Sequence, residues 1–341
     1  MDVLVTGGAG YIGSHTIIEL INNTDWNPIS IDNYSNSTPE TYERIKEITG
    51  KSVKHYNVNL LNFKELEVVF KENNIQGIIH FAAHKSVPES VQKPLDYYNN
   101  NLNSLVNVLQ LQKDFDVPYF IFSSSCSVYG SSKDLPVTEN TPIGQTECPY
   151  AYTKVVGENI LMDIAKIQKN QKFIALRYFN PVGAHVSGKI GELPTGVPNN
   201  LVPYITQTAV GIREQLTVFG NDYDTVDGTC VRDYIHVSDI AKAHIMALQL
   251  LKTKEQDDNF DVFNLGTGKG VSVMQAIEAF EKCAEQKLNY KIGPRREGDI
   301  AEVFADTEKS KTILGWEAEK TIDEMMSSAW KWQQYLSSQS L

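Results

Sequence analysis

The chain has 341 residues, 41% hydrophobic and 21% charged, a composition that indicates one large or two smaller globular domains and argues against disorder. The formal net charge of −11 disfavours nucleic acid and anionic membranes as partners, so an anionic ligand must be met by a few local Arg or Lys side chains. There is no secretory leader, no apolar run near the ~20 residues of a membrane helix, and no metal-type pairing among the four cysteines, so we expect a cytoplasmic protein with reduced thiols.

The first half of the chain alternates short apolar runs with segments of helical periodicity. Strands are expected at 3–5, 28–32, 75–81 and 119–123, and helices at 11–22, 63–72, 101–112 and 151–167. This alternation predicts an α/β fold with a Rossmann-type, doubly wound parallel sheet covered on both faces.

From about residue 180 the chain becomes richer in Gly and Pro. A loop at 187–200, a helix at 201–213, a strand at 216–220 and a solvated loop at 252–258 are expected there. We therefore predict a Rossmann domain over residues 1–180 and a smaller C-terminal α/β substrate lobe over 181–341, with the chain crossing back to the sheet.

Glycines recur at 7, 8, 10 and 13, between the first expected strand and the first helix. Gly7 allows a tight turn, Gly10 lets a pyrophosphate approach the backbone, and Gly13 lets the helix pack on the strand. The helix N-terminus adds N–H donors and a favourable dipole. Because the glycines follow a strand and open a helix, they predict dinucleotide binding more strongly than a merely structural turn.

Asp32 ends the second expected strand, roughly 20 residues past the glycine turn. A carboxylate at this place accepts hydrogen bonds from the adenosine ribose and repels a 2′-phosphate. No Arg or Lys follows before Arg44. These features favour NAD over NADP, the alternative being that Asp32 is an ordinary turn residue.

A tyrosine stands four residues before a lysine in three places. The pairs are Tyr42 and Lys46, Tyr129 and Lys133, and Tyr150 and Lys154. On a helix this spacing puts both side chains on one face, where the ammonium can lower the phenol pKa from about 10 toward neutrality and make the tyrosine a general base.

Only Tyr150 opens a helix with apolar periodicity, because Tyr129 is followed by a Gly-Ser-Ser turn and Tyr42 lies near the expected adenosine end. Ser125 follows a buried strand and is expected at the carboxyl edge of the sheet. We predict that Tyr150 takes a hydroxyl proton, Ser125 hydrogen-bonds the same oxygen, and Lys154 tunes Tyr150 and holds the nicotinamide ribose. The alternative is an ordinary surface Tyr/Lys pair.

Longer segments resemble the UDP-glucose 4-epimerases, a family of the extended short-chain dehydrogenase/reductase superfamily. They lie at 5–15, 80–83, 176–185, 198–201, 231–237 and 295–299, so the resemblance extends over nearly the whole chain.

The resemblance implies which residues contact each ligand. NAD contacts are implied at Tyr11, Ile12, Asp32, Asn33, Asn36, Ser37, Asn59, Leu60, Phe81, Ala82, Lys85, Asn100, Ser125, Tyr150, Lys154 and Tyr178. UDP-sugar contacts are implied at Lys85, Ser125, Tyr150, Phe179, Asn180, Asn200, Leu201, Thr217, Val218, Phe219, Arg232, Arg296, Asp299 and Val303. Two arginines suit a diphosphate and Asp299 suits the uridine ribose, although each arginine has a surface salt bridge as its alternative.

Two positions vary from the family pattern. Asn59 stands where the family usually has Asp, and its amide oxygen can still accept from the adenine amino group. Val303 stands beside the implied sugar pocket, where some relatives place a bulky aromatic residue. Valine leaves more room and suggests tolerance for UDP-N-acetyl sugars.

The resemblance implies the interconversion of UDP-galactose and UDP-glucose through a 4-keto sugar and tightly bound NAD, in a homodimer. The helices at 101–112 and 155–167 could pair across a two-fold axis, or their apolar faces could be core. The rival functions are a 4,6-dehydratase, a dehydrogenase that releases NADH, and a non-catalytic nucleotide sensor. The first needs an Asp-Glu pair after the serine, and Cys126 and Ser127 stand there instead.

Two further patterns predict no additional site. Gly266 to Gly270 is expected to be a strand-to-helix turn because it lacks the residue order of a phosphate loop. His80, His185 and His236 have no ligand-like spacing, so no metal is expected.

Overall fold

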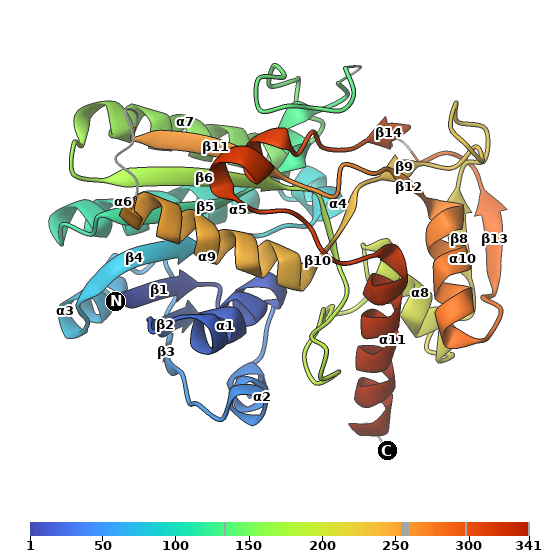
Figure 1. The fold of residues 1–341 in the computed structure, drawn as a ribbon, viewed down its shortest axis with the longest axis horizontal. Coiled ribbons are helices and arrows are strands. Elements are labelled where there is room, and N and C mark those ends of the chain that lie inside the picture. The colour runs from blue at the N-terminus through green and yellow to red at the C-terminus, as the bar shows by residue number, and fades with distance from the viewer. Residues whose placement is uncertain (133, 254–258, 297–298, 340–341) are drawn as a thin grey trace.

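Seven parallel strands form the central sheet of the protein, in the order β11-β6-β5-β4-β1-β2-β3 (Figure 1). The computed structural model describes residues 1–132, 134–253, 259–296 and 299–339. The strands are β1 (Asp2–Thr6), β2 (Asn27–Asp32), β3 (Lys54–Asn57), β4 (Ile75–His80), β5 (Tyr119–Ser125), β6 (Lys172–Tyr178) and β11 (Phe260–Leu265). The strand order reverses between β1 and β4, which is where ligands bind in open α/β sheets. The predicted fold class is confirmed.

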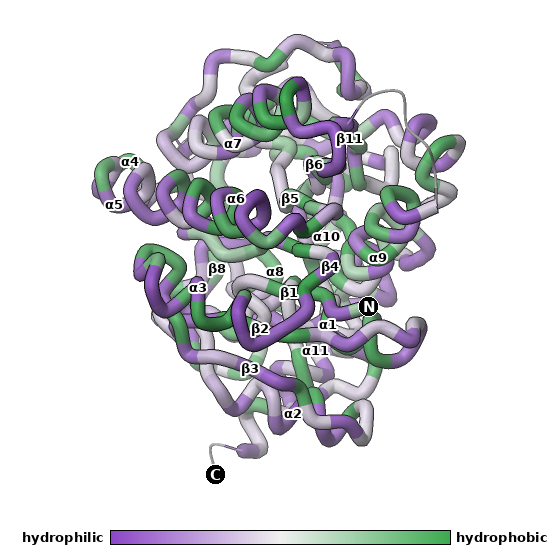
Figure 2. Tube along the Cα trace, turned by 90° about the vertical axis from the view of Figure 1, so that its left-hand side faces the viewer, coloured by the Kyte–Doolittle hydropathy of each residue, from purple (hydrophilic) through white to green (hydrophobic). Residues whose placement is uncertain are grey.

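Helices cover both faces of this sheet, as Figure 2 shows from the side. One face carries α1 (Tyr11–Asn23), α2 (Glu40–Thr49) and α9 (Val237–Thr253), which share a core cluster with β1. The other carries α3 (Phe63–Glu72), α6 (Ser104–Asp114) and α7 (Pro149–Ile167). The short helices α4 (Val87–Gln92) and α5 (Pro94–Tyr98) contact α7. Burial of these apolar stripes is the main source of stability for such an arrangement.

The C-terminal lobe is built from three helices and three small sheets. Its helices are α8 (Leu201–Ala209), α10 (Val273–Ala284) and α11 (Ile322–Gln339), which share a second core around Ile205, Phe280 and Met326. Its strands are β7 (Asn180–Val182) with β10 (Tyr234–His236), β8 (Leu216–Phe219) with β13 (Tyr290–Gly293), and β9 (Val231–Arg232) between β12 (Val271–Ser272) and β14 (Glu302–Val303).

Several boundaries differ from those expected. A π-helical turn, η1 (Asn99–Asn103), precedes α6, and the helix expected at 201–213 ends at Ala209. Helix α9 continues through Thr253, and residues 254–258 of the expected solvated loop lie outside the described residues. The segment 266–270 joins β11 to β12 just before α10, as expected of a turn.

The chain crosses back to the large sheet, because β11 pairs with β6 and α9 packs on α1. The division at residue 180 stays a prediction. Among the helices of the described chain, none has both the length and the apolar character to span a membrane.

Candidate functional site

The glycine turn between β1 and α1 has no room for side chains. Gly7 has φ +70°, and its amide donates to the Ile31 carbonyl at 2.7 Å. A Cβ on Gly13 would overlap the Gly7 carbonyl oxygen, and one on Gly7 would lie 2.9 Å from the Ala82 amide. Gly10 caps α1 without any side-chain acceptor. The N-terminus of α1 therefore presents backbone amides in the cradle that a pyrophosphate requires.

Asp32 connects the glycine turn to the loop that follows β2. Its carboxylate accepts from the Ala9 amide at 3.0 Å, the Tyr34 amide at 2.9 Å and the Ser37 hydroxyl at 2.8 Å. The residue is 9% exposed, so one edge of the carboxylate still reaches solvent. With four lone-pair sites, it can accept further hydrogen bonds from a ribose diol.

The other residues implied at the adenosine end lie around this loop. Asn33 accepts from the Ser35 amide at 3.1 Å, and Asn36 accepts from the Thr195 hydroxyl at 2.8 Å. Asn59 is exposed after β3 and accepts from the Leu61 amide at 3.0 Å. Neighbouring Leu60 is 6% exposed.

Tyr150, Lys154 and Ser125 converge at the carboxyl edge of the sheet. Tyr150 and Lys154 lie one turn apart on α7, and the Lys154 ammonium is 5.9 Å from the centre of the Tyr150 ring. The ammonium donates to the Ser123 carbonyl at 2.7 Å, and Ser125 ends β5 two residues later. Tyr150 and Ser125 are each 9% exposed.

Burial governs the charges of this group. It raises the pKa of Tyr150 above its usual value, and a hydrogen bond with Ser125 opposes this only partly. Burial also lowers the pKa of Lys154 to about 8, against the effect of Glu158. In the protein without a bound ligand, desolvation of the phenolate therefore dominates the pKa of Tyr150. The expected lowering of this pKa by Lys154 stays a prediction.

The rival tyrosines serve other purposes. Tyr42 is 4% exposed, stacks on His55 and shares a 2.7 Å hydrogen bond with Ser30. Tyr129 is fully buried and donates to Asn264 at 2.6 Å. Its expected partner at position 133 lies outside the described residues. Both phenols are held in the interior by other side chains.

The residues implied around the nicotinamide follow the ends of β4 and β6. The Phe81 and Tyr178 rings lie 4.6 and 6.2 Å from the His244 ring, and Tyr178 is paired with Ser125 across β5 and β6. The Ala82 amide donates to the Thr6 hydroxyl at 3.4 Å.

Lys85, Asn100 and Asn200 are three further residues implied to contact NAD or the UDP-sugar. Lys85 pairs with Glu192 at 3.1 Å, and the Glu192 carboxylate also accepts from Asn200 at 2.7 Å. Asn100 donates to Asn101 at 3.0 Å. Glu192 thus connects Lys85 after β4 to the start of α8, where Leu201 lies.

Arg232 and Arg296 come together on one carboxylate. Asp299 accepts from Arg296 at 2.6 Å and lies 4.0 Å from the Arg232 guanidinium. Arg296 lies over the Phe219 ring, 5.6 Å from its centre. Thr217 and Val218 precede Phe219 on β8. The salt bridge considered as an alternative for Arg296 is present, and it brings two guanidiniums to the same place.

The implied sugar contacts near β7 are largely enclosed. Phe179 and Val303 are 2% and 9% exposed and belong to one apolar cluster with Val128. The Asn180 amide donates to the Asp233 carbonyl at 3.0 Å.

Sequence reasoning missed several buried or linking charges beside these residues. Asp233 is fully buried and accepts from the Thr267 amide at 2.8 Å, the Gly268 amide at 3.1 Å and the Ala305 amide at 3.2 Å. It therefore holds the 266–270 turn and the segment that follows β14 next to Arg232. The sequence feature that could have indicated this buried role is the position of Asp233, directly after Arg232 and before the apolar residues Tyr234 and Ile235.

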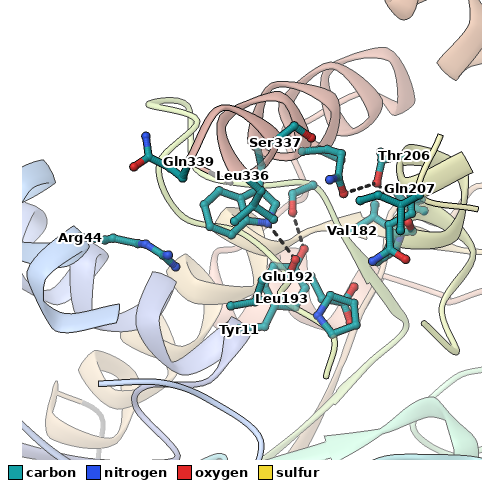
Figure 3. A pocket seen from close by; sticks show the side chains of 18 residues that line it. Tyr11, Arg44, Val182, Glu192, Leu193, Thr206, Gln207, Leu336, Ser337 and Gln339 are labelled. Atoms are coloured by element: carbon teal, nitrogen blue, oxygen red, sulfur yellow. Dashed lines mark hydrogen bonds between the residues drawn. The ribbon is translucent and has the colours of Figure 1, made fainter. Parts of the chain in front are cut away.

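A cavity of about 590 Å³ lies between the start of α1 and the helices α8 and α11 (Figure 3). Its lining includes Tyr11, Glu192 and Trp332, and it extends along α8 and α11. The Arg44 guanidinium lies 5.2 Å from the Trp332 ring centre at this cavity. Ser125 and Tyr150 are not among the lining residues, so the cavity is separate from the proton-transfer group.

All four cysteines are free thiols. Within the described ranges, His, Cys, Asp and Glu side chains form no group of three or more that could hold a metal ion.

Known proteins resemble the chain over almost its whole length. A family model described as GDP-mannose 4,6 dehydratase matches residues 4–329. A UDP-glucose 4-epimerase from Pasteurella multocida (strain Pm70) is 49% identical over 333 residues, covering 98% of this chain and 97% of that protein. The crystal structure of a UDP-glucose 4-epimerase from Bifidobacterium longum, in complex with NAD+ and UDP, has a TM-score of 0.93 and 49% identity and covers 98% of both chains. That of a Stenotrophomonas maltophila UDP-glucose 4-epimerase, with bound NAD and formylated UDP-arabinopyranose, has a TM-score of 0.96 and 43% identity and covers 99% of both chains.

Proposed function

The chain belongs to the UDP-glucose 4-epimerase family, and from this premise we propose that it interconverts UDP-galactose and UDP-glucose through a transient 4-keto sugar. The observation that carries the proposal is the convergence of Ser125, Tyr150 and Lys154 at the sheet edge that also carries the glycine turn. These residues form a proton-relay set beside a dinucleotide cradle.

The chain's own residues fit NAD. The amides at the start of α1 would hold the pyrophosphate, Asp32 the adenosine ribose, Asn59 the adenine amino group, and Lys154 the nicotinamide ribose. When bound, NAD supplies a hydride acceptor for C4 of the sugar and a positive charge near Tyr150.

Tyr150 exchanges the proton of the sugar 4-hydroxyl in both directions. As phenolate it removes the proton when C4 is oxidised, and as phenol it returns the proton when the opposite face of C4 is reduced. Ser125 hydrogen-bonds the reacting oxygen in both half-reactions. Desolvation disfavours the phenolate in the protein alone, so a further positive charge beside Tyr150 would favour formation of the base.

The sugar has to turn over between the two half-reactions while the nucleotide stays in place. Arg232 and Arg296 would anchor the diphosphate by charge-assisted hydrogen bonds, with Asp299 fixing their orientation. Phe179 and Val303 would border the sugar with apolar side chains, which make no directional hydrogen bonds to a particular ring orientation.

The 4,6-dehydratase alternative, suggested by the description of the matching family model, lacks its acid and base here. Ser125 is followed by Cys126 and Ser127, and burial raises the pKa of the Cys126 thiol to about 12. A neutral thiol is a poor substitute for a carboxyl pair in the elimination of water.

We further propose that the sugar site accepts N-acetylated UDP-sugars. Val303 is a small side chain at the wall of the implied sugar pocket, where an aromatic residue would occupy the space of an acetamido group. The test is to compare UDP-galactose with UDP-N-acetylgalactosamine as substrates. A rate on the acetamido sugar at least about 1,000-fold lower, a difference of ~4 kcal/mol, would contradict this proposal.

We also infer a cytoplasmic homodimer. Helices α6 and α7 carry apolar side chains on their outer surfaces, including Val106 (48% exposed), Tyr152 (48%) and Ile167 (74%). Leu95 on α5 (78% exposed) extends this surface. Exposed apolar residues gathered on adjoining helices are typical of a protein–protein interface.

The proposed function is tested by incubating purified protein with UDP-galactose and no added reductant. We expect UDP-glucose to form, NAD to remain with the protein, and NADH not to accumulate in solution. Stoichiometric NADH release would indicate a dehydrogenase, and a dehydrated keto sugar would indicate a dehydratase; either result contradicts the proposal.

A further inference from the structure

A bidentate ion pair is buried directly beneath the predicted proton-relay group. Glu158 on α7 is fully buried and Arg177 on β6 is 5% exposed. Arg177 donates through Nε to Glu158 Oε1 at 2.9 Å and through Nη2 to Oε2 at 2.6 Å. Ser124 on β5 donates to the same Oε1 at 2.5 Å. One carboxylate thus joins a helix to two adjacent strands.

The hydrogen bonds continue from Arg177 into the next elements. Its Nη1 donates to the Tyr129 hydroxyl at 3.0 Å, in the 3-10 turn η2 (Cys126–Tyr129), and Tyr129 donates to Asn264 on β11 at 2.6 Å. The Asn264 amide donates to the Glu139 carboxylate at 2.7 Å. Because these partners are satisfied and mostly buried, the network fixes the relative positions of its elements.

Each member of the pair adjoins a residue of the predicted site. Ser124 precedes Ser125 and Arg177 precedes Tyr178, and these neighbours face each other across β5 and β6. Glu158 follows Lys154 by one helical turn, and Lys154 follows Tyr150 by another. Network residues therefore stand next to Ser125 and Tyr178 in sequence and one helical turn after Lys154, which itself lies one turn after Tyr150.

The close approach of α7 to the sheet depends on Gly157, one residue before Glu158. A Cβ on Gly157 would lie 2.6 Å from the Phe122 ring, so the helix already sits as close to β5 as a glycine allows. Apolar packing alone is non-directional and would permit small rotations of the helix. A bidentate Arg–carboxylate contact is directional, so it restricts the rotation of α7 relative to the sheet.

We propose that the Glu158–Arg177 ion pair is a positioning device that keeps Tyr150 and Lys154 on α7 aligned with Ser125 on β5. This inference rests on the proposed epimerase function and assigns these residues no contact with substrate or NAD. A buried ion pair is weak evidence for stability, since apolar replacements are often as stable, so its value here lies in the alignment.

The pair also carries charge close to Lys154. Groups that titrate or carry charge around Lys154 and Glu158 are Tyr150, His80, Cys126, Tyr129, Glu139, Arg177 and Tyr178. Among them, Glu158 favours the Lys154 ammonium and Arg177 offsets Glu158. Changing one member of the pair should therefore move the titration of Lys154, and changing both should move it little.

The first test separates alignment from charge through Arg177→Lys. Lysine keeps the positive charge but cannot make two parallel hydrogen bonds to Glu158. We expect kcat for UDP-galactose to fall about 10- to 100-fold while KM changes less than about 3-fold, because misplacement of reacting groups weakens the transition state more than substrate binding. The pH at which activity declines on the alkaline side should stay where it is.

Glu158→Gln is the complementary change. Without the carboxylate the Lys154 ammonium loses a favourable charge, so the alkaline decline should begin about one pH unit lower or more. Because an uncompensated Arg177 can unfold the protein, we pair this variant with Glu158→Met/Arg177→Met, which removes both charges. That double variant should fold and lose kcat like Arg177→Lys, with an alkaline decline close to that of the unmodified protein.

A matched control removes an ion pair at the other end of β11. Asp261 and Lys309 pair at 2.6 Å and are 28% and 30% exposed. Asp261→Asn/Lys309→Met should leave both kcat and the pH profile unchanged. If Arg177→Lys or the double Met variant folds with kcat within about 2-fold of the unmodified protein, the positioning role is overturned.

A titration that needs no turnover separates this inference from the proposed function. NMR of lysine labelled with ¹³C at Cε follows Lys154 directly in the purified protein. If the unmodified protein fails to interconvert the UDP-sugars, the function is wrong, yet Glu158→Gln must still lower the Lys154 titration. An unchanged titration in that variant overturns the coupling regardless of activity.

Discussion

Tyr150, the proposed base, lies in an environment that favours its protonated form. Burial raises the pKa of the phenol, and the nearest cation, Lys154, is itself desolvated to a pKa of about 8. A positive charge on a ligand bound beside Tyr150 would lower this pKa and favour the phenolate.

Replacing Tyr150 by Phe removes the proton acceptor and leaves the packing intact. We expect turnover of UDP-galactose to fall at least about 1,000-fold, the range of general base catalysis, with the NAD content per chain unchanged. Tyr152→Phe is the matched control, since this neighbour on α7 is 48% exposed, and it should retain full activity. Substantial turnover by the Tyr150 variant would reject the assigned base.

Asn59 is a single residue at which NAD affinity can be tuned. Its amide oxygen already accepts from Leu61, and an aspartate there would add charge to a hydrogen bond with the adenine amino group. We expect Asn59→Asp to slow NAD loss on dilution by about 3- to 10-fold. Asn62→Asp, at the N-cap of α3, should leave NAD loss unchanged. Faster loss from the Asn59 variant would contradict an adenine contact.

At the scale of elements, the close packing of the β1–α1 junction requires glycine, because the turn has no room for a Cβ atom at Gly7 or Gly13. Gly13→Ala would push a methyl group into the Gly7 carbonyl and open the cradle. We expect the purified variant to carry little or no NAD, as measured by absorbance after denaturation.

Gly50→Ala is the control for backbone effects. Gly50 ends α2 with φ +72° and has nothing near its Cβ position, so alanine there costs only about 1 kcal/mol of strain. This variant should keep its NAD. A Gly13 variant with normal NAD content would show that the turn does not bind the cofactor.

Strands β1, β2, β4 and β5 of the large sheet were predicted because they are short apolar runs closed by turn residues, as at Ile75–His80. Strand β3 (Lys54–Asn57) is polar and β6 lies in a stretch for which no strand was expected, so both were missed. Strands β9, β12 and β14 have two residues each and exist only through their long-range partners, so no local pattern marks them. Phe260–Leu265 gives no local sign that it pairs with β6 (Lys172–Tyr178), which lies far before it in the sequence, and so extends the large sheet.

The candidate site divides in the same way. The positions of Ser125, Tyr150 and Lys154 at the end of a strand and the start of a helix were predictable from local sequence patterns, whereas their catalytic role stays a proposal. Glu192 was missed because its contacts with Lys85 and Asn200 join a loop to two distant segments. Glu158 continues the spacing of Tyr150 and Lys154, and that periodicity was the signal available for it.

At the scale of the whole molecule, the outer surfaces of α6 and α7 predict self-association. We expect sedimentation to give twice the mass of one chain, and Val106→Glu to shift the protein toward monomer by burying a charge in the interface. Val226→Glu, at an exposed valine of the C-terminal lobe, should remain dimeric. A monomeric unmodified protein would contradict the proposal.

The proposed mechanism uses both lobes, because the sugar is oxidised and reduced at C4 while its nucleotide stays bound to the protein. This is tested most directly with UDP-galactose that carries deuterium at C4. We predict that the UDP-glucose formed keeps the deuterium at C4, because the hydride returns within a single turnover. Loss of the deuterium to solvent, or its appearance in free NADH, would contradict reversible oxidation at C4 and with it the proposed function.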